Sequence, residues 1–497
     1  MAVTLSAAVR RHARERPAAP AFVAGDDRLT WAGYDAWADR LAAGLAAHGE
    51  PGDRVAVLLP DGPAVHAAFL AVERAGRVIV GIGPRAGDRE VAHLVGVTGA
   101  RTLVTDRPEV ADRLGLVAVD PAPTRAGGPT VAGPDPTTRT DLWLINSTSG
   151  TTGLPKCVRH DQQRWFAFHD LAVDAGALGP DDVFMSVLPA PFGFGIWTAH
   201  VTPTLLGAPT VLTARFDPDA VLAAMARERV TVLAAVSTQF VMLLNAPTLD
   251  AHDLSHLRVL FTGGEMVPEA RAAEFEDRTG CTVLQFYGSN ETGALSHTTL
   301  DDPRDRRLRT AGRVIPSMQV RLLAADDTDA GGGPGVAACR GPLRCLGYHG
   351  DPVADRALYT ADGWMRTGDV CTIDADGYLT VVGRAADIII RGGRNISAAQ
   401  VEDEVTTHPG VALAAAVAMP DPVFGERVCV YVEAPAGVVA PDLDALRGHL
   451  AARGVGKELW PERLVALDAL PIASGGKVAK GALRDDLRQR LAAEASS

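Results

Sequence analysis

The chain has 497 residues, of which 47% are hydrophobic, so it is long enough to form two or more domains with sizeable cores. Its formal net charge of -12 provides no broad attraction for nucleic acid or for an anionic membrane surface. Met1 to Pro17 contain no apolar core of signal-peptide length, and no later stretch reaches the roughly 20 apolar residues of a membrane span. We therefore expect a cytoplasmic protein with no membrane span and no nucleic-acid partner.

Short apolar segments alternate with helical stretches from about Leu5 to Phe286. Asp217 followed by Pro218, for example, predicts the start of a helix that covers Val221 to Val230. This alternation predicts an α/β fold with largely parallel sheets. The expected buried strands are Val55 to Leu59, Val78 to Val80, Leu103 to Thr105, Val232 to Val236 and Val259 to Thr262.

The last quarter of the chain is predicted to form a separate, smaller unit. Asp120 to Thr140 and Asp326 to Gly335 have loop composition, but strand-like segments resume directly after both. Ser397 to Gln400 form a capping box that begins a helix ending near Thr407. We predict an N-terminal domain at residues 1–383, a hinge at 384–386 and a mobile C-terminal α/β domain at 387–497. Beyond the capping box we expect strands at Val411 to Ala418 and Val428 to Glu433, and a helix at Leu443 to Arg453.

The cysteines are scattered, and neither a CxxC pair nor a Cys/His cluster is present. This distribution favours buried, reduced thiols over a zinc site or a disulfide framework. The cysteines are Cys157, Cys281, Cys339, Cys345, Cys371 and Cys429.

A segment rich in hydroxyl groups and glycine, Ser147 to Lys156, follows the apolar strand Leu142 to Ile145. Glycines allow backbone N–H groups to close around phosphate oxygens, so the segment predicts a phosphate-binding loop. It is not a Walker A loop, because Gly153 to Lys156 lacks the Gly-Lys-Ser/Thr that would begin a helix and hold magnesium. Taken alone, such a segment is also compatible with a flexible surface loop.

Four further motifs follow this loop. Together the five resemble, in order and over essentially the whole chain, the core motifs of the adenylate-forming superfamily. That superfamily includes acyl- and aryl-CoA synthetases, adenylation domains of peptide synthetases and firefly luciferase. The resemblance implies a large N-terminal domain and a small mobile C-terminal domain of the firefly-luciferase type. The four motifs are Tyr287 to Gly293, Trp364 to Asp369, Gly383 with Arg384, and Gly476 with Lys477.

The resemblance also implies an ATP site. Lys156 and the hydroxyl groups of its loop would hold the β- and γ-phosphates, while Glu291, with Thr151, would bind Mg²⁺. Tyr287 would lie against the adenine, and Asp369 would accept hydrogen bonds from the ribose hydroxyls. The implied ATP and AMP contacts, which include Arg384, are Thr148, Ser149, Gly150, Thr151, Thr152, Gly153, Gly264, Glu265, Phe286, Tyr287, Gly288, Asn290, Asp369 and Arg384.

Lys477 lies in a turn rich in glycine and serine, and in the family this lysine touches both the carboxylate of the acid and the α-phosphate. It would stabilise charge as the carboxylate attacks, which makes Lys477 the implied catalytic residue with Glu291 and Lys156. Two positions depart from the family pattern. Asn290 replaces a common threonine, although its amide could still donate to the α-phosphate. Ala386 replaces the usual polar hinge residue, so a hinge here rests on backbone torsions alone.

The family comparison also indicates where the acid binds. Peptide-synthetase domains place an aspartate near the position of Phe192 to pair with an α-amino group, and the segment Phe192 to Trp197 contains no acidic residue. We therefore expect a bulky apolar acid of the aryl, alicyclic, polycyclic or fatty class, although core packing could equally explain the aromatic side chains. The expected pocket residues are Phe192, Phe194, Trp197, Ala235, Ser237, Gly263, Gly264 and Ala294.

The expected acceptor of the acyl group is the thiol of CoA, bound by Arg391, Gly392 and Gly393, since no carrier module follows the C-terminal segment. The main alternative is a free-standing enzyme that loads a carrier protein, because Lys457 to Lys477 also resembles aryl-acid ligases. An AMP-binding regulator without turnover is a third reading. A homodimeric assembly stays open.

Overall fold

The computed structural model describes residues 4–122, 137–148, 155–265, 267–324, 326–384, 387–391, 394–473 and 477–495. Within these residues, two mixed sheets with mainly parallel strands form the larger part of the molecule. The first sheet has the order β15 (Arg313–Val314), β14 (Gly293–His297), β13 (Thr282–Ser289), β12 (Val259–Gly263), β11 (Val232–Ala234), β9 (Phe184–Ser186), β10 (Thr210–Leu212), β1 (Pro20–Ala24) and β2 (Asp27–Thr30).

The second sheet lies across a shared hydrophobic core from the first. Its order is β6 (Val117–Val119), β5 (Thr102–Thr105), β3 (Arg54–Leu58), β4 (Val78–Gly81), β7 (Leu144–Ser147) and β8 (Cys157–His160). Residues from both sheets and from the helices between them contribute to this core, among them Val55, Phe69, Trp143, Phe184 and Phe261. Buried apolar side chains on both faces of a strand are what the continuous apolar segments of a parallel sheet predict.

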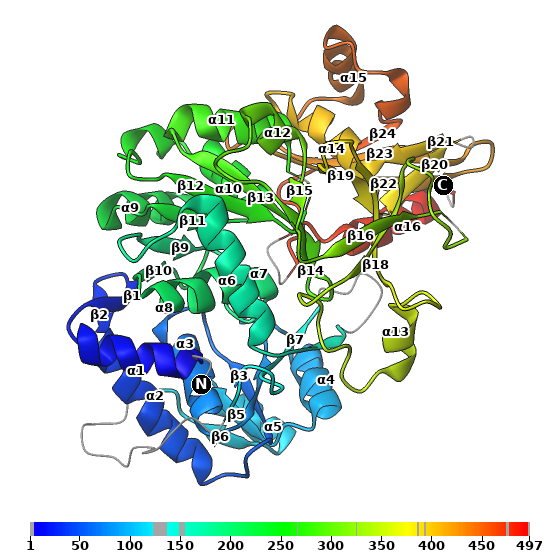
Figure 1. Cartoon of the computed structure of the whole chain (residues 1–497). Helices are drawn as coiled ribbons and strands as arrows, with labels where there is room; N and C mark the ends of the chain where they lie inside the picture. The colour runs from blue at the N-terminus through cyan, green and yellow to red at the C-terminus, as the bar shows by residue number, and fades with distance from the viewer. Residues whose placement is uncertain are drawn as a thin grey trace.

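Two smaller sheets complete the strands. The antiparallel sheet β16 (Gln319–Leu323), β17 (Gly335–Arg340), β18 (Met365–Ile373) and β19 (Leu379–Arg384) follows the first large sheet. The C-terminal sheet has the order β21 (Arg394–Ser397), β20 (Ile388–Arg391), β23 (Gly425–Glu433) and β22 (Leu413–Asp421), with β24 (Arg463–Leu467) paired to β23. In Figure 1 this sheet lies at the end of the molecule away from α1, next to β19.

The helices cover the sheets and connect their strands (Figure 1). The α-helices are α1 (Leu5–Glu15), α2 (Trp31–Ala46), α3 (Pro63–Arg74), α4 (Asp88–Thr98), α5 (Pro108–Leu114), α6 (Gln163–Gly176), α7 (Gly193–Gly195), α8 (Thr202–Leu206), α9 (Pro218–Glu228), α10 (Ser237–Asn245), α11 (Glu269–Thr279), α12 (Arg304–Arg309), α13 (Pro352–Ala357), α14 (Ala398–Thr406), α15 (Leu443–Ala452) and α16 (Lys480–Ala495). A π-helical turn at Ile196–Val201 joins α7 to α8, and short 3₁₀ turns lie at Leu249–Ala251 and Lys457–Leu459.

The predicted α/β class with parallel-rich sheets is confirmed, and local signals placed several elements correctly. Asp217 accepts a hydrogen bond from the Ala220 N–H at 2.9 Å, and Ser397 accepts one from the Gln400 N–H at 3.3 Å, so both side chains cap their helices. Helix α9 ends at Glu228, before the expected Val230, because Arg229 adopts a left-handed conformation with φ of 55°. All six cysteines are buried and free, as expected. No described helix is both long and apolar enough to cross a membrane.

Candidate active site

Two cavities of about 610 Å³ each meet at the edge of the first large sheet. The cleft cavity lies between α10, α11 and the C-terminal segment, and Asp369, Glu402 and Asp403 are among the residues that line it. The aromatic cavity lies between α6, α7 and β13, and Trp165, Phe168 and Trp197 are among its lining residues. Both cavities therefore open to one junction. The residues common to both are Gly263, Gly264, Phe286, Tyr287, Gly288, Arg384 and Lys477.

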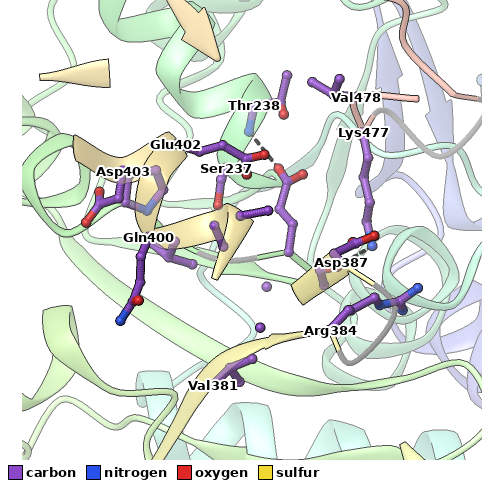
Figure 2. Close-up of a pocket in the computed structure, with 18 of the residues that line it drawn as sticks. Ser237, Thr238, Val381, Arg384, Asp387, Gln400, Glu402, Asp403, Lys477 and Val478 are labelled. Carbon is purple, nitrogen blue, oxygen red and sulfur yellow. Dashed lines mark hydrogen bonds between the residues drawn. The ribbon is translucent and has the colours of Figure 1, made fainter. Parts of the chain in front are cut away.

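Lys477 is the group that the C-terminal segment contributes to this junction. Its ammonium group donates a hydrogen bond to the carbonyl of Gly264. Burial lowers the pKa of Lys477, whereas the charges of Glu265 and Asp369 oppose that shift. Figure 2 shows Lys477 extending into the cleft cavity, with Arg384 drawn among the other lining side chains. The cavity thus holds a desolvated cation beside two carboxylates.

Asp369 is fixed from two sides. The Tyr287 hydroxyl donates to one carboxylate oxygen of Asp369 at 2.9 Å, and Arg384 Nε lies 3.3 Å from the other. Strands β18 and β19 set this arrangement, because Asp369 and Arg384 are direct partners in the antiparallel register. Burial raises the pKa of Asp369, and the Arg384 charge acts against the rise. The carboxylate is therefore held in place by groups that leave it accessible from the cavity.

A second set of polar groups surrounds Glu291 at the other side of the junction. The Tyr348 hydroxyl donates to Glu291 Oε1 at 2.8 Å, and Lys156 Nζ lies 5.0 Å from the centre of the Tyr348 ring. The Thr148 N–H donates to the Lys156 carbonyl at 3.0 Å, which closes the base of the loop that both residues flank. Ser149, Gly150, Thr151, Thr152 and Gly153, which the sequence also predicts to bind phosphate, lie outside the described residues.

Asn290 belongs to a buried chain of polar side chains, here called the polar chain, that also contains Asn146, His160 and Arg164. Asn290 Nδ2 donates to Asn146 Oδ1 at 2.7 Å, and Asn146 Nδ2 donates to Asn290 Oδ1 at 3.2 Å. His160 Nε2 lies 2.7 Å from Asn146 Oδ1, and Arg164 Nη1 lies 2.6 Å from His160 Nδ1. A guanidinium can only donate, so His160 Nδ1 accepts and Nε2 carries the hydrogen. Burial lowers the pKa of His160 well below its usual value, which keeps the ring neutral.

Aromatic rings form one wall of the aromatic cavity, beside the polar chain. The rings of Phe194 and Trp197 stack with centroids 5.4 Å apart, and Trp197 meets Phe286 edge-on at 4.8 Å. From α6, Phe168 lies 5.9 Å from Trp197 and 5.5 Å from Trp165. The glycines of α7 allow this close packing, since a Cβ on Gly195 would lie 2.2 Å from the carbonyl oxygen of Pro189. Such a wall suits a flat apolar group.

The structure brings most of the described candidate residues to these two cavities. Ala235 does not line either cavity, because its side chain is fully buried in the core beneath β11. Ser237 lines the cleft cavity rather than the aromatic one. Arg391 lines neither and donates instead to Glu462 and, at 2.8 Å, to the Glu458 carbonyl. Ala386, Gly392 and Gly393 lie outside the described residues.

The remaining candidates line the cavities as follows. Glu265 and Asp369 line the cleft cavity. The candidates at the aromatic cavity are Thr148, Lys156, Phe192, Phe194, Trp197, Gly263, Gly264, Phe286, Tyr287, Gly288, Asn290, Glu291, Ala294, Arg384 and Lys477.

Several residues of the site were missed by sequence reasoning. Asn146 and His160 stand in short, apolar strand segments, and Tyr348 lies in a loop far from any motif. Trp165 and Phe168 repeat at helical spacing on α6, but that pattern equally predicts ordinary core packing. The one available signal was Arg164, a charged residue beside this apolar stripe.

Comparison with known proteins agrees with this geometry. Residues 9–349 match the family described as AMP-binding enzyme, and residues 400–477 match the AMP-binding enzyme C-terminal domain. The chain belongs to the AMP-binding enzymes. This AMP-binding enzyme is 36% identical to feruloyl-CoA synthase of Amycolatopsis sp over 492 residues, which span 95% of this chain and 97% of that protein. The predicted membership of the adenylate-forming superfamily is thus confirmed.

Two further relatives of this AMP-binding enzyme extend the comparison. A protein of Mycobacterium tuberculosis named salicyl-AMP ligase / salicyl-S-ArCP synthetase is 33% identical over 495 residues, with 92% of this chain and 85% of that protein covered. The solved structure of ATP-bound MatB from Rhodopseudomonas palustris is similar with a TM-score of 0.86 and 26% identity, covering 98% of this chain and 99% of that one.

The first prediction concerns the backbone beneath Lys477. Gly264 has φ of +80°, and a Cβ there would lie 3.2 Å from Lys477 Nζ, so Gly264→Ala should both strain the backbone and displace the ammonium group. We expect ATP–pyrophosphate exchange to fall by about 10-fold or more with every acid tested, since small displacements of a charged group in a preorganised site are costly.

Gly280→Ala is a matched control. Gly280 also has a positive φ, +75°, at the end of α11, but no atom lies within 4 Å of the methyl group that alanine would add. It should lose similar stability but keep the exchange rate. Equal rates for the two variants would contradict the role given to Gly264.

The second prediction concerns the acidic side of the cleft cavity. Burial, followed by the charges of Glu404 and Glu269, raises the pKa of Asp403 to about 6. This pKa exceeds that of an aspartate in the unfolded chain, so the folded state favours protonated Asp403. The contribution of Asp403 to the free energy of unfolding is therefore complete below about pH 4, and it is lost as pH rises through about 6. Asp403→Asn should therefore stabilise the protein at pH 7 by about 2 kcal/mol more than at pH 4. Urea unfolding of both proteins across this range measures the difference, and a difference independent of pH would contradict the prediction.

Proposed function

We propose that this chain is an ATP-dependent carboxylic acid:CoA ligase, which activates a bulky apolar acid as acyl-AMP, releases pyrophosphate and then forms the acyl-CoA thioester. The observation that carries the proposal is the position of Lys477. Its ammonium group lies where a cavity lined by charged and polar groups meets a cavity lined by aromatic rings. An acid carboxylate and an α-phosphate would meet at that point.

In the first half-reaction a carboxylate oxygen of the acid attacks the α-phosphorus of ATP, and the bond to pyrophosphate breaks without any net proton transfer. The approach of two anions needs positive charge, which Lys477 would supply as a preorganised contact. Lys156 and the loop that precedes it would hold the departing phosphates. A bound Mg²⁺ would neutralise part of their charge, and its protein ligands would be Thr151 and Glu291, the latter fixed by the Tyr348 hydroxyl.

The nucleoside would lie at the junction of the cavities. The Asp369 carboxylate still has acceptor positions for hydrogen bonds from two ribose hydroxyls. Arg384 lies beside it and would contact ribose or phosphate. Tyr287 would pack against the adenine, with Gly264, Glu265, Phe286 and Gly288 along the edges of the same slot.

The aromatic cavity supports a bulky apolar acid, with an aryl acid as the best fit to its stacked rings. Phe192, Phe194 and Trp197 line the cavity beside Gly263 and Ala294, and no carboxylate that could pair with an α-amino group appears at Phe192 to Trp197. The names of two relatives, feruloyl-CoA synthase and salicyl-AMP ligase, agree with an aryl acid.

The second half-reaction requires a thiol to attack the acyl carbonyl, with AMP leaving and the thiol proton released. We assign residues 1–383 and 387–497 to two domains that rotate about 384–386, with Ala386 as the pivot. The rotation would withdraw Lys477 and bring Arg391, Gly392 and Gly393 to the acyl-AMP. CoA is the proposed acceptor, and the alternative acceptor is the phosphopantetheine thiol of a carrier protein, in agreement with the name of the salicyl-S-ArCP synthetase relative.

A pyrophosphate-release assay over a panel of aryl, alicyclic, fatty and amino acids tests the proposal, with CoA either present or omitted. A CoA ligase should turn over only with CoA and should yield the acyl thioester by mass spectrometry. Release of a single equivalent of pyrophosphate, unaffected by CoA, would favour the carrier-protein alternative. No release with any acid would overturn the assignment as an acid-activating enzyme.

The third prediction separates the two half-reactions. Lys477→Ala should lower acyl-AMP formation by about 10²-fold or more, because it removes the charge that stabilises the first transition state. Thioester formation from supplied acyl-AMP should fall by less than about 3-fold, since the lysine would have left the site by then. Both rates can be measured by quenched-flow chromatography on the same preparation. Equal loss of the two rates would remove Lys477 from its assigned step.

A further inference from the structure

Arg164, in the first turn of α6, is a buried cation that forms no salt bridge with a described carboxylate, although the charges of Asp161 and Glu291 act on it from farther away. Its side chain is 2% exposed, and it lines the aromatic cavity. Burial lowers the pKa of the guanidinium to about 10, so it stays charged at neutral pH. A buried charge without a directly paired counter-ion is costly, which is why most buried arginines form ion pairs.

The hydrogen bonds of Arg164 use only one side of the guanidinium. Nη1 makes both of them: it contacts His160 Nδ1 at 2.6 Å and donates to the Asn290 carbonyl at 2.9 Å. Nε is buried and has no hydrogen-bond partner. Nη2 donates to none of the described residues either. The edge formed by Nε and Nη2, which suits a planar acceptor such as a carboxylate, is therefore unsatisfied.

Two rings of the aromatic wall lie beside the Arg164 side chain. The guanidinium carbon lies 5.0 Å from the centre of the Trp165 ring and 5.8 Å from that of Phe168. These rings continue through Trp197 to Phe194. A flat ring bound against the wall would thus have an unpaired hydrogen-bond donor nearby.

Arg164 does not belong to the junction at which chemistry is proposed. It lines the aromatic cavity but not the cleft cavity, whereas Lys477 lines both. The carboxylate that reacts must lie near Lys477, so Arg164 faces a different part of the acid. The contacts of Arg164 with His160 and Asn290 use only Nη1, and they require a hydrogen-bond donor but no charge.

We propose that Arg164 is a specificity-determining residue that binds a second hydrogen-bond acceptor on the substrate, so that the preferred acid is an aryl acid with a carboxylate, phenol, nitro or carbonyl oxygen on its ring. The inference rests on the proposed function and deepens it. The aromatic wall would select the ring, and the unsatisfied guanidinium edge would select the substituent. An acid that lacks the acceptor leaves the buried donor unpaired, and sites of this kind discriminate more strongly than apolar pockets do.

The test compares kcat/KM for acyl-AMP formation in matched pairs of benzoic acids, each with an acceptor or an apolar group of similar shape at the same ring position: hydroxyl against methyl, and nitro against isopropyl. At one ring position or more, the parent enzyme should prefer the acceptor by about 10-fold or more. Arg164→Met should reduce this preference to about 1-fold, because the acceptor acid loses its donor, whereas any loss from the broken contact with His160 is common to both acids and cancels in the ratio.

Two further variants keep the test sharp. Arg164→Gln retains a donor for the Asn290 carbonyl without the charge, and it should lose the preference while keeping the thermal stability of the parent. Arg139→Met is the matched control: Arg139 packs over the Phe166 ring of the same helix, 3.8 Å from its centre, but lines neither cavity. It should keep the preference.

If Arg164→Met and Arg164→Gln lower kcat/KM for both members of a pair by the same factor, the inference is overturned. Arg164 would then act only on the fold or on a step common to both acids. A parent enzyme that turns over both members of every pair equally well would also overturn it. Either result would leave the proposed function standing, whereas the absence of pyrophosphate release from every acid would remove both.

Discussion

The hydrogen bond from Lys477 to the carbonyl of Gly264 spans 213 residues, and the geometry of the site depends on it. It ties the C-terminal segment to the loop after β12 and places a desolvated ammonium group where the two cavities meet. Glu265 and Asp369 oppose the effect of burial on this cation, which keeps the charge in a pocket that would otherwise disfavour it. The contact is made by one side chain, which the proposed rotation would withdraw after the first half-reaction.

The polar chain gives this site a rigid second wall. Because the Arg164 guanidinium can only donate, it fixes the tautomer of His160, which in turn orients the Asn146 amide and, through it, Asn290. Glu291 follows Asn290 directly and is held by Tyr348. Asn290 and Glu291 are therefore oriented by hydrogen bonds among buried groups. Exposed ion pairs would hold them less firmly, because water and salt screen such pairs. If Glu291 binds Mg²⁺ as proposed, a carboxylate held in this way would need little reorganisation during adenylyl transfer.

The two cavities differ in character because different elements build them. The cleft cavity is lined by titratable side chains from α14 and the C-terminal segment. Its charge therefore depends on pH and on the position of that segment. The aromatic cavity is built from α6, α7 and β13, which belong to the main core, and its rings interlock. The rotation proposed about residues 384–386 would move the acidic half and leave the apolar half in place. One active site could then run two half-reactions while the acid stays bound.

The sequence by itself determined the family, the α/β class and the residues of the nucleotide motifs, because those depend on local patterns: a loop after an apolar strand, a capping residue, a short ordered motif. It also predicted that Phe192, Phe194 and Trp197 share one pocket, and they do line one cavity. It placed Ala235 there too, and only the packing of the chain just after β11 shows that this side chain is buried in the core. Nothing local distinguishes Asn146, His160 or Tyr348 from ordinary buried residues. Their roles arise from contacts across 14 to 144 residues of sequence, which only the tertiary structure brings within hydrogen-bonding distance. The unsatisfied edge of Arg164 is likewise a property of the folded chain, since a missing partner can be recognised only once every neighbour of the guanidinium is in place.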